Sequence, residues 1–119
     1  MTTFVDPFGI TASGKTGIAT LSIANSPATP IPHDAGWMVA VLTPTTNNAI
    51  AELPSGASVG DICEVHLMNS NFARCTINAP SGETINGNSG AQVSVGVGRL
   101  FRKVVSNTWS PIGPSDGNQ

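Results

Sequence analysis

The sequence predicts an all-β fold, a compact antiparallel β-sandwich or barrel with an extended N-terminal arm. The 119 residues include 13 glycines and nine prolines, a composition typical of short strands joined by turns. Charged residues make up 10% and hydrophobic residues 39%, which argues against a disordered acidic or basic tail. Several short runs alternate apolar and polar residues, the spacing of a strand with one buried face. The length suits one domain with one core.

The chain divides at about residue 33. Residues 1–33 contain four prolines and few large side chains, so this segment can bury little surface by itself. We expect it to be an N-terminal arm with at most one short strand, from Gly17 to Ile23. Residues 34–112 are expected to form the β domain, and residues 113–119 a flexible tail.

The β domain is expected to begin with two strands that are buried on both faces. The run "WMVAVLT" starts at Trp37 and is stopped by Pro44. The residues "PTTNN" then make a turn, and "AIAEL" forms a second strand that is stopped by Pro54.

The segment "DICEVHLMNSNFARCTINAP" predicts a β-hairpin with residues 69–71 at its tip. A three-residue tip pairs Met68 with Phe72, Leu67 with Ala73, Val65 with Cys75, and Cys63 with Ile77. One face of the hairpin is then apolar, and the other carries four polar side chains, with His66 opposite Arg74: Glu64, His66, Arg74 and Thr76.

Three further strands are expected after a glycine-rich connection. Alternating small apolar residues, Ala91, Val93, Val95 and Val97, predict a strand with one buried face. A strand from Arg99 to Val105, a tight turn at "SNT" and a short returning strand with Trp109 complete the domain. The chain has no tyrosine and few aromatic rings, so we expect Trp109 to be used for packing rather than for carbohydrate binding.

The stretch "GITASGKTG" has the spacing of a phosphate-binding P-loop, with Gly9, Gly14, Lys15 and Thr16 in the motif positions. A P-loop joins a buried parallel strand to the N-terminus of a helix. Pro7 interrupts the few residues before Gly9, and the prolines that follow exclude a long helix. We therefore interpret the stretch as a polar loop and expect no bound nucleotide or other cofactor.

Cys63 and His66 have the spacing of a metal-binding C-x-x-H pair, which Cys75 and His33 could complete. Side chains three apart on a strand point to opposite faces, however, so we expect no metal site. The two cysteines share a face but lie diagonally, about 7–8 Å apart, too far for an ordinary disulfide. Both are expected to be reduced core thiols.

No set of residues meets the geometric requirements of catalysis. His33 and His66 are the available bases, and Ser89 lacks the flanking glycines of a nucleophile elbow. The acidic candidates fall at predicted strand ends or on a solvated face: Glu52, Glu64 and Glu83. We expect no enzymatic activity.

Charge and hydropathy also limit the partners. The net charge of −2 provides no basic surface for nucleic acid. No apolar run is long enough to cross a membrane, and no signal peptide is recognisable. We expect a soluble protein with neither nucleic acid nor membrane as its partner.

Three segments, "ELPSGASVGDICEV", "INAPSGETING" and "FRKVVSNTW", together resemble a small all-β module of tailed-bacteriophage virion proteins. The matching positions, in about half of the chain, are Leu53, Pro54, Gly60, Asp61, Pro80, Gly82, Ile85, Gly87, Lys103, Ser106 and Trp109. Asp61 can cap a turn, Gly82 and Gly87 permit positive φ, and Ile85 can anchor its loop to the core.

The resemblance implies a head decoration (cement) protein. Such a protein would bind the major capsid protein as a homotrimer on the outer capsid surface of the virion, after assembly in the host cytoplasm. The apolar residues Phe4, Val5 and Phe8 make the arm the expected capsid contact. The same module also resembles parts of tail fibres and spikes, so a tail component that recognises the host surface is the alternative.

Overall fold

The computed structural model describes residues 18–33, 36–68, 72, 74–96 and 98–112. These residues form ten strands and no helix, which confirms the predicted all-β class. The strands are β1 (Ile18–Ile23), β2 (Thr29–Pro30), β3 (Trp37–Pro44), β4 (Ile50–Glu52), β5 (Ile62–Leu67), β6 (Arg74–Asn78), β7 (Thr84–Ile85), β8 (Gly90–Ser94), β9 (Arg99–Val105) and β10 (Thr108–Ile112).

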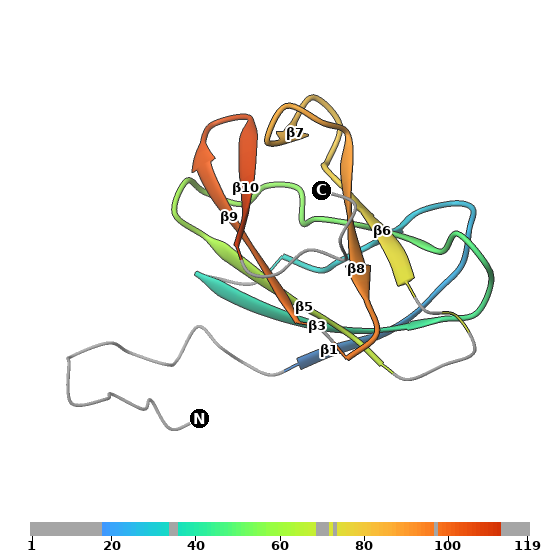
Figure 1. Cartoon of the computed structure of the whole chain (residues 1–119). Coiled ribbons are helices and arrows are strands. Elements are labelled where there is room, and N and C mark those ends of the chain that lie inside the picture. Colours follow the sequence, from blue (N-terminus) through green and yellow to red (C-terminus); the bar gives the residue numbers. More distant parts are fainter. Residues whose placement is uncertain (1–17, 34–35, 69–71, 73, 97, 113–119) are drawn as a thin grey trace, which may run out of the picture.

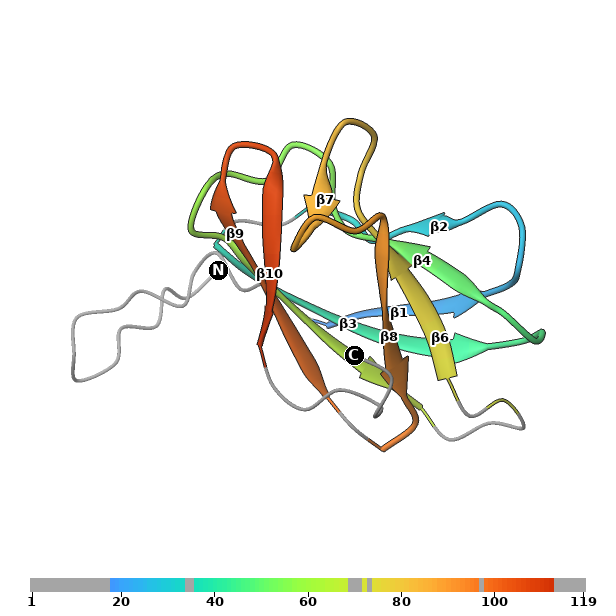
Figure 2. The same ribbon diagram turned by 45° about the horizontal axis from the view of Figure 1, so that its top comes forward.

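The strands form two sheets, and the chain alternates between them through its first six strands. One sheet has the order β1-β3-β5-β9-β10-β7 and the other the order β2-β4-β6-β8. Strands β1, β3 and β5 are parallel neighbours, and so are β2, β4 and β6. Figures 1 and 2 show β1, β3 and β5 side by side, with β6 and β8 in the other layer.

This path makes a solenoid-like stack of three coils rather than a clear sandwich or a closed barrel. Ile18 pairs with Val39, and Val39 pairs with Glu64, so successive coils contain 21 and 25 residues. Parallel strands need such long crossovers, because a tight turn can join only antiparallel neighbours. Strands β8, β9 and β10 then pair antiparallel with their neighbours β6, β5 and β9 and close one end of the stack.

The predicted hairpin of β5 and β6 is wrong, because these strands lie in different sheets. Val65 pairs with Ala40 and Arg99, whereas Cys75 pairs with Val93. His66 and Arg74 are likewise not opposite each other, since His66 pairs with Val41. The antiparallel pairing predicted for the domain therefore holds only for its C-terminal strands.

The predicted faces of β5 and β6 are nevertheless confirmed. Their apolar side chains are buried in the common core: Cys63, Val65, Leu67, Cys75 and Ile77. Glu64 and His66 lie on the outer face of the six-stranded sheet. The alternation of a strand determines which side chains face inward, but it does not specify the neighbouring strand.

Other strands follow the sequence closely. β3 runs from Trp37 to Pro44, β9 from Arg99 to Val105, and β9 and β10 form the expected antiparallel hairpin. Part of the segment assigned to the arm belongs to the sheets as β1 and β2, and it contributes Ile23 of β1 and Ile31, which follows β2, to the core.

Several predictions fall on residues that the structure does not describe. The proposed capsid-contact residues Phe4, Val5 and Phe8 lie outside the described residues, as do the stretch 9–17, the hairpin tip 69–71, and the tail 113–119. Within the described ranges, no helix has the length and apolar character needed to span a membrane.

Candidate functional site

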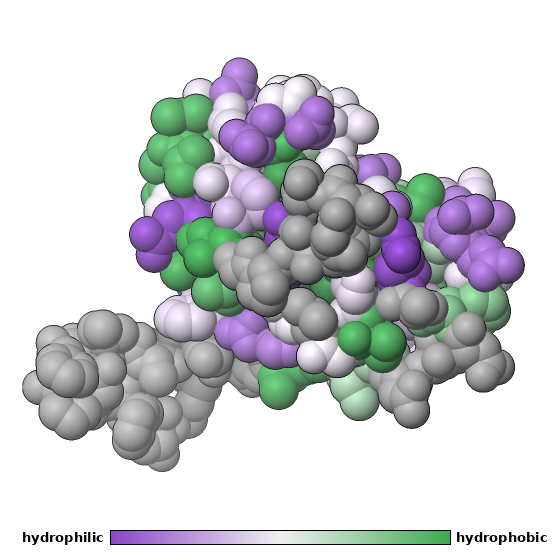
Figure 3. All heavy atoms as spheres, viewed as in Figure 1, coloured by the Kyte–Doolittle hydropathy of each residue, from purple (hydrophilic) through white to green (hydrophobic). Residues whose placement is uncertain are grey.

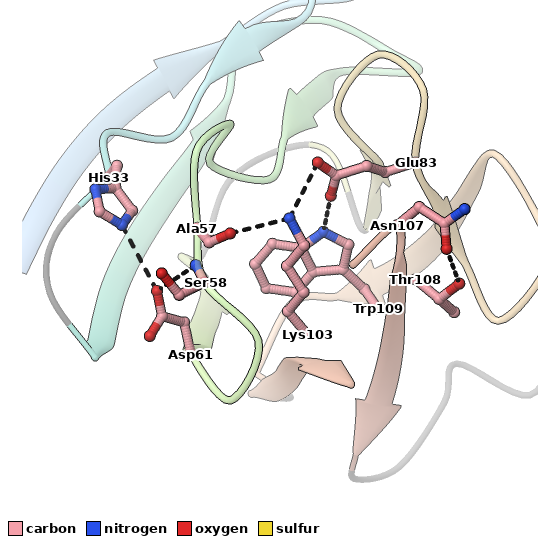
Figure 4. A network of polar contacts seen from close by, with 9 residues as sticks. All are labelled: His33, Ala57, Ser58, Asp61, Glu83, Lys103, Asn107, Thr108 and Trp109. Carbon is pink, nitrogen blue, oxygen red and sulfur yellow. Dashed lines mark hydrogen bonds and ion pairs between the residues drawn. The ribbon is translucent and has the colours of Figure 1, made fainter. Parts of the chain in front are cut away.

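Residues from three separate parts of the sequence meet at the end of the molecule formed by β7, β9 and β10. The backbone N–H of Gly60 donates to the Lys103 carbonyl at 2.7 Å, and the N–H of Lys103 donates to the Asp61 carbonyl at 3.0 Å. The N–H of Asn86 donates to the Trp109 carbonyl at 2.8 Å. The connections before β5 and after β6 are thereby joined to the β9–β10 hairpin. Figure 4 shows the contacts of Lys103 with Ala57 and Glu83 at the same end.

A buried ion pair lies at the centre of this end. The Lys103 ammonium is 3.2 Å from Glu83 Oε2 and donates to the Ala57 carbonyl at 3.0 Å. The second carboxylate oxygen, Glu83 Oε1, accepts a hydrogen bond from Trp109 Nε1 at 2.8 Å. Lys103 is only 5% exposed, and a buried charge is tolerated when it is paired and hydrogen-bonded.

Sequence reasoning missed this pair. It placed Glu83 at a strand end or on a solvated face, whereas the side chain is largely buried against Lys103 and Trp109. A signal was present, because Lys103 is two residues from the core residue Phe101 on β9 and therefore points inward with it. An inward lysine requires a carboxylate or carbonyl partner.

Several of the motif residues lie around this pair. Trp109 is fully buried, and Ile85 anchors its loop in the core. Gly82 and Gly87 have φ of +82° and +85°, values that glycine adopts without strain. Asp61 Oδ2 accepts the Ser58 N–H at 2.8 Å and so caps the turn before β5.

Three valines form an exposed apolar patch on the outside of this end, which we call the valine patch: Val59, Val104 and Val105. Their side chains are 57%, 43% and 52% exposed. Val59 precedes Gly60 and Val104 follows Lys103, so the backbone bond between Gly60 and Lys103 holds these two valines next to each other. Figure 3 shows apolar surface gathered over the end of β9 and the loop before β5.

Two further groups of polar contacts include a histidine. On the outer face of the six-stranded sheet, Trp37 Nε1 donates to Glu64 Oε1 at 3.0 Å, and His66 Nε2 contacts Glu64 Oε2. His33 Nε2 is 3.6 Å from Asp61 Oδ2. Among the described residues, no three His, Cys, Asp or Glu side chains group as they would around a metal ion.

The cysteines are free and buried, as predicted. Burial raises the pKa of the Cys63 thiol from 9.0 to about 12, with a smaller contribution from the negative charge of Glu64. Burial alone raises the pKa of Cys75 from 9.0 to about 12. Both thiols stay protonated at neutral pH, and a protonated thiol is a poor nucleophile and a poor metal ligand.

These groups combine a buried polar centre with exposed valines. The charged groups of the ion pair contact each other, and the exposed side chains at this end include both the three valines and polar residues such as Ser58, Ser106 and Asn107. Comparison of the chain with known protein families, with curated proteins and with solved structures finds no match in any of the three.

Proposed function

We propose that this chain is a structural virion protein that binds the outside of an assembled phage capsid and stabilises it. The observation that carries the proposal is the valine patch, which presents three exposed apolar side chains. The loops and the hairpin beneath it are connected by the buried Lys103–Glu83 ion pair and by the hydrogen bond from Trp109 to Glu83. The residues that carry the sequence resemblance surround the same end.

A rigid apolar patch is an efficient contact surface. Burying it against a partner removes apolar area from water, which contributes about 25 cal/mol per Å² before the costs of association. The supporting loops are hydrogen-bonded to β9 and β10, so little conformational entropy remains to be lost on binding. The low charge of the chain keeps the desolvation cost of binding small.

A single patch of three valines is too small for tight binding, so the proposed protein acts through several copies. In a homotrimer, linked patches would bind with an avidity well above that of one patch. Binding to the assembled major capsid protein, and not to its dissociated subunits, would stabilise the shell by mass action. The arm residues Phe4, Val5 and Phe8 remain a predicted second contact.

Co-sedimentation with capsids of the same phage that lack this protein tests the proposal. The wild-type chain is expected to pellet with the capsids and to raise the temperature at which they disrupt. The double variant Val104→Asp, Val105→Asp is expected to lose most of the bound fraction while its own unfolding temperature changes little, because both positions are exposed.

The matched control is Thr20→Asp, which places a charge at an exposed position of β1 in the same sheet. This variant should bind like the wild type. Wild-type protein that stays in the supernatant would overturn the proposed function. A valine variant that pellets like the wild type would show that the valine patch is not the capsid contact. The mass in solution, measured by light scattering, tests the trimer.

A tail-fibre or spike component is the second candidate, and the solenoid-like stacking of the coils favours it. Parallel coils can continue from one unit into the next, and β1 and β2 form an end of the stack to which a further coil could be added. Quantifying the chain in purified virion fractions separates the candidates, because a decoration protein is present in many copies on heads and a fibre component in few copies on tails.

A further inference from the structure

The outer face of the six-stranded sheet is apolar at one end. Its apolar side chains lie in two adjacent rows of paired residues, which we call the outer apolar face: Ile18, Trp37, Val39, Ile62, Leu100 and Ile112. Ile18 and Ile112 are exposed, and Trp37 is 42% exposed. Val39 is buried without belonging to the common core. A contiguous apolar surface of this kind marks an interaction site.

These side chains point away from the core by strand alternation. Val39 alternates with the core residues Met38 and Ala40. Figure 1 shows β6 and β8 on the inner side of the sheet and no described strand on its outer side. Parallel strands are usually covered on both faces. The apolar run of β3 predicts burial on both faces, and the described strands cover only one of them.

Two charged side chains lie within the same rows, and they have opposite signs. Glu64 is on β5 and pairs with Leu100 of β9. Arg102 is on β9 and pairs with Ile62 of β5. The half of the face formed by β3 and β5 is therefore negative, and the half formed by β9 and β10 is positive.

No ion pair joins these two charges within the described ranges. The Glu64 carboxylate accepts a hydrogen bond from Trp37 Nε1 at 3.0 Å and contacts His66 Nε2, which holds it on the side of β3. Among the described residues, the exposed Arg102 side chain has no ion-pair partner. A carboxylate has about four acceptor sites, so Glu64 can still bind a guanidinium that approaches from outside the sheet.

We propose that the outer apolar face is the contact between copies of this chain, with the β3–β5 half of one copy packed against the β9–β10 half of the next. Glu64 of each copy would then face Arg102 of its neighbour, with apolar side chains around the pair. Contacts between two different surfaces can close into a ring of copies. The inference rests on the homotrimer of the proposed function and assigns its subunit interface.

The charges determine which halves can meet. Two β3–β5 halves would place Glu64 against Glu64, and like charges brought together at an interface are costly. Opposite halves instead bury one ion pair among apolar side chains. This pattern favours a second copy as the occupant of the face, because a second copy supplies both halves with the required charges.

The mass in solution of the unmodified chain and of one charge variant tests the proposal. Wild-type protein is expected to form an oligomer by light scattering. Arg102→Glu places a second carboxylate opposite Glu64 and should raise the dissociation constant at least ~10-fold. The matched control is Arg74→Glu, the same substitution at an exposed position of β6 in the other sheet, which should leave the mass unchanged. A wild-type monomer, or equal masses for the two variants, would overturn the proposal.

Acrylamide quenching of tryptophan fluorescence provides an independent readout on the unmodified chain. Trp109 is fully buried and Trp37 is exposed in the single chain, so the quenchable fluorescence comes from Trp37. Quenching should be weak in the oligomer and should increase on dilution to the monomer. In Arg102→Glu it should be strong at concentrations where the wild type is an oligomer. An oligomer in which Trp37 is still quenched would overturn the proposal, because its interface lies elsewhere.

The two measurements together distinguish a second copy from other occupants of the face. A monomer with a shielded Trp37 would mean that another segment of the same chain covers the face, and would overturn the proposal. Failure of the interface is also separable from failure of the proposed function. If the wild type pellets with capsids but Arg102→Glu leaves its mass unchanged, capsid binding stands and this interface is wrong. An oligomer that dissociates in Arg102→Glu but does not pellet supports the interface without the capsid function. Thr20 lies outside the two rows, so the control used for capsid binding does not affect the interface.

Discussion

The parallel coils of β1–β6 and the antiparallel strands β8–β10 belong to one core but are held together differently. The coils rest on long-range backbone pairing and apolar packing, with small and aliphatic side chains in register between strands. The antiparallel end contains the large aromatic residues Phe101 and Trp109 and the buried Lys103–Glu83 pair. A stack of similar parallel coils can accept a further coil at its edge. The end at which the stack terminates instead needs specific contacts, such as those of the aromatic residues and the ion pair.

The largest expected effect comes from removing the aromatic centre of the antiparallel end. Trp109→Ala should lower the free energy of unfolding by about 3–5 kcal/mol, because it leaves a cavity and removes the hydrogen bond to Glu83. Urea denaturation measures the change. Ile112→Ala, at the exposed end of the same strand, should cost much less, and equal losses would show that Trp109 has no special role there.

The buried ion pair should rank next. Glu83→Gln is expected to cost about 3 kcal/mol, because it leaves the Lys103 ammonium buried without a counter-charge. Replacing both residues, with Glu83→Gln and Lys103→Met, should recover most of that loss. A double variant as unstable as the single one would mean that the ion pair itself, and not the unpaired charge, determines stability.

The two buried thiols lie on β5 and β6, in the coils. Their titration therefore tests the stability of the coils, as Trp109→Ala tests the stability of the antiparallel end. Their folded pKa values of about 12 lie above 9.0, so the stability they contribute is complete below pH 9 and is lost as the pH rises toward 12. At pH 10 the expected loss is about 1.4 kcal/mol for each thiol.

Unfolding at pH 8 and pH 10 in the wild type and in Cys63→Ala, Cys75→Ala measures this loss, which the double variant should lack. At pH 8, a thiol reagent should modify the wild type only as it unfolds. If the thiols react before the Trp109 environment changes, the coils open independently of the antiparallel end.

The smallest effects concern two glycines with close neighbours. A Cβ at Gly90 would lie 2.6 Å from Asn78 Oδ1 and 3.0 Å from the Ile77 carbonyl, a backbone atom in a packed sheet. A Cβ at Gly98 would meet the His66 ring at 2.8 Å, and that half-exposed ring can move. Gly90→Ala should therefore cost about 1–3 kcal/mol and Gly98→Ala less than about 1 kcal/mol. Thermal unfolding of both variants tests the order.

The difference between the two regions also explains what the sequence could predict. The β9–β10 hairpin was predicted with the correct bounds for β9, because its two strands are joined by a short turn at Ser106 and Asn107. The coils pair residues more than 20 positions apart, and β5 and β6 were assigned to each other because the polar residues between them also fit a hairpin tip. Burial alternation gave the correct inward faces in both regions.

The candidate site was predictable only in part. Turn residues such as Asp61 and Gly82 carry recognisable local signals. The pairing of Lys103 with Glu83 and the hydrogen bond between Gly60 and Lys103 depend on which loops the tertiary fold brings together. No local pattern specifies that arrangement.

The second coil is longer than the first, and most of the extra length lies in the connection between Leu53 and β5. That connection includes Ser55 and Gly56, which are exposed, and a Cβ at Gly56 would meet no atom within 4 Å. The stack has therefore accommodated an insertion without losing register. A short peptide inserted between Ser55 and Gly56 would be displayed on the same connection as Val59, which makes this coil a site for carrying a foreign epitope or a label.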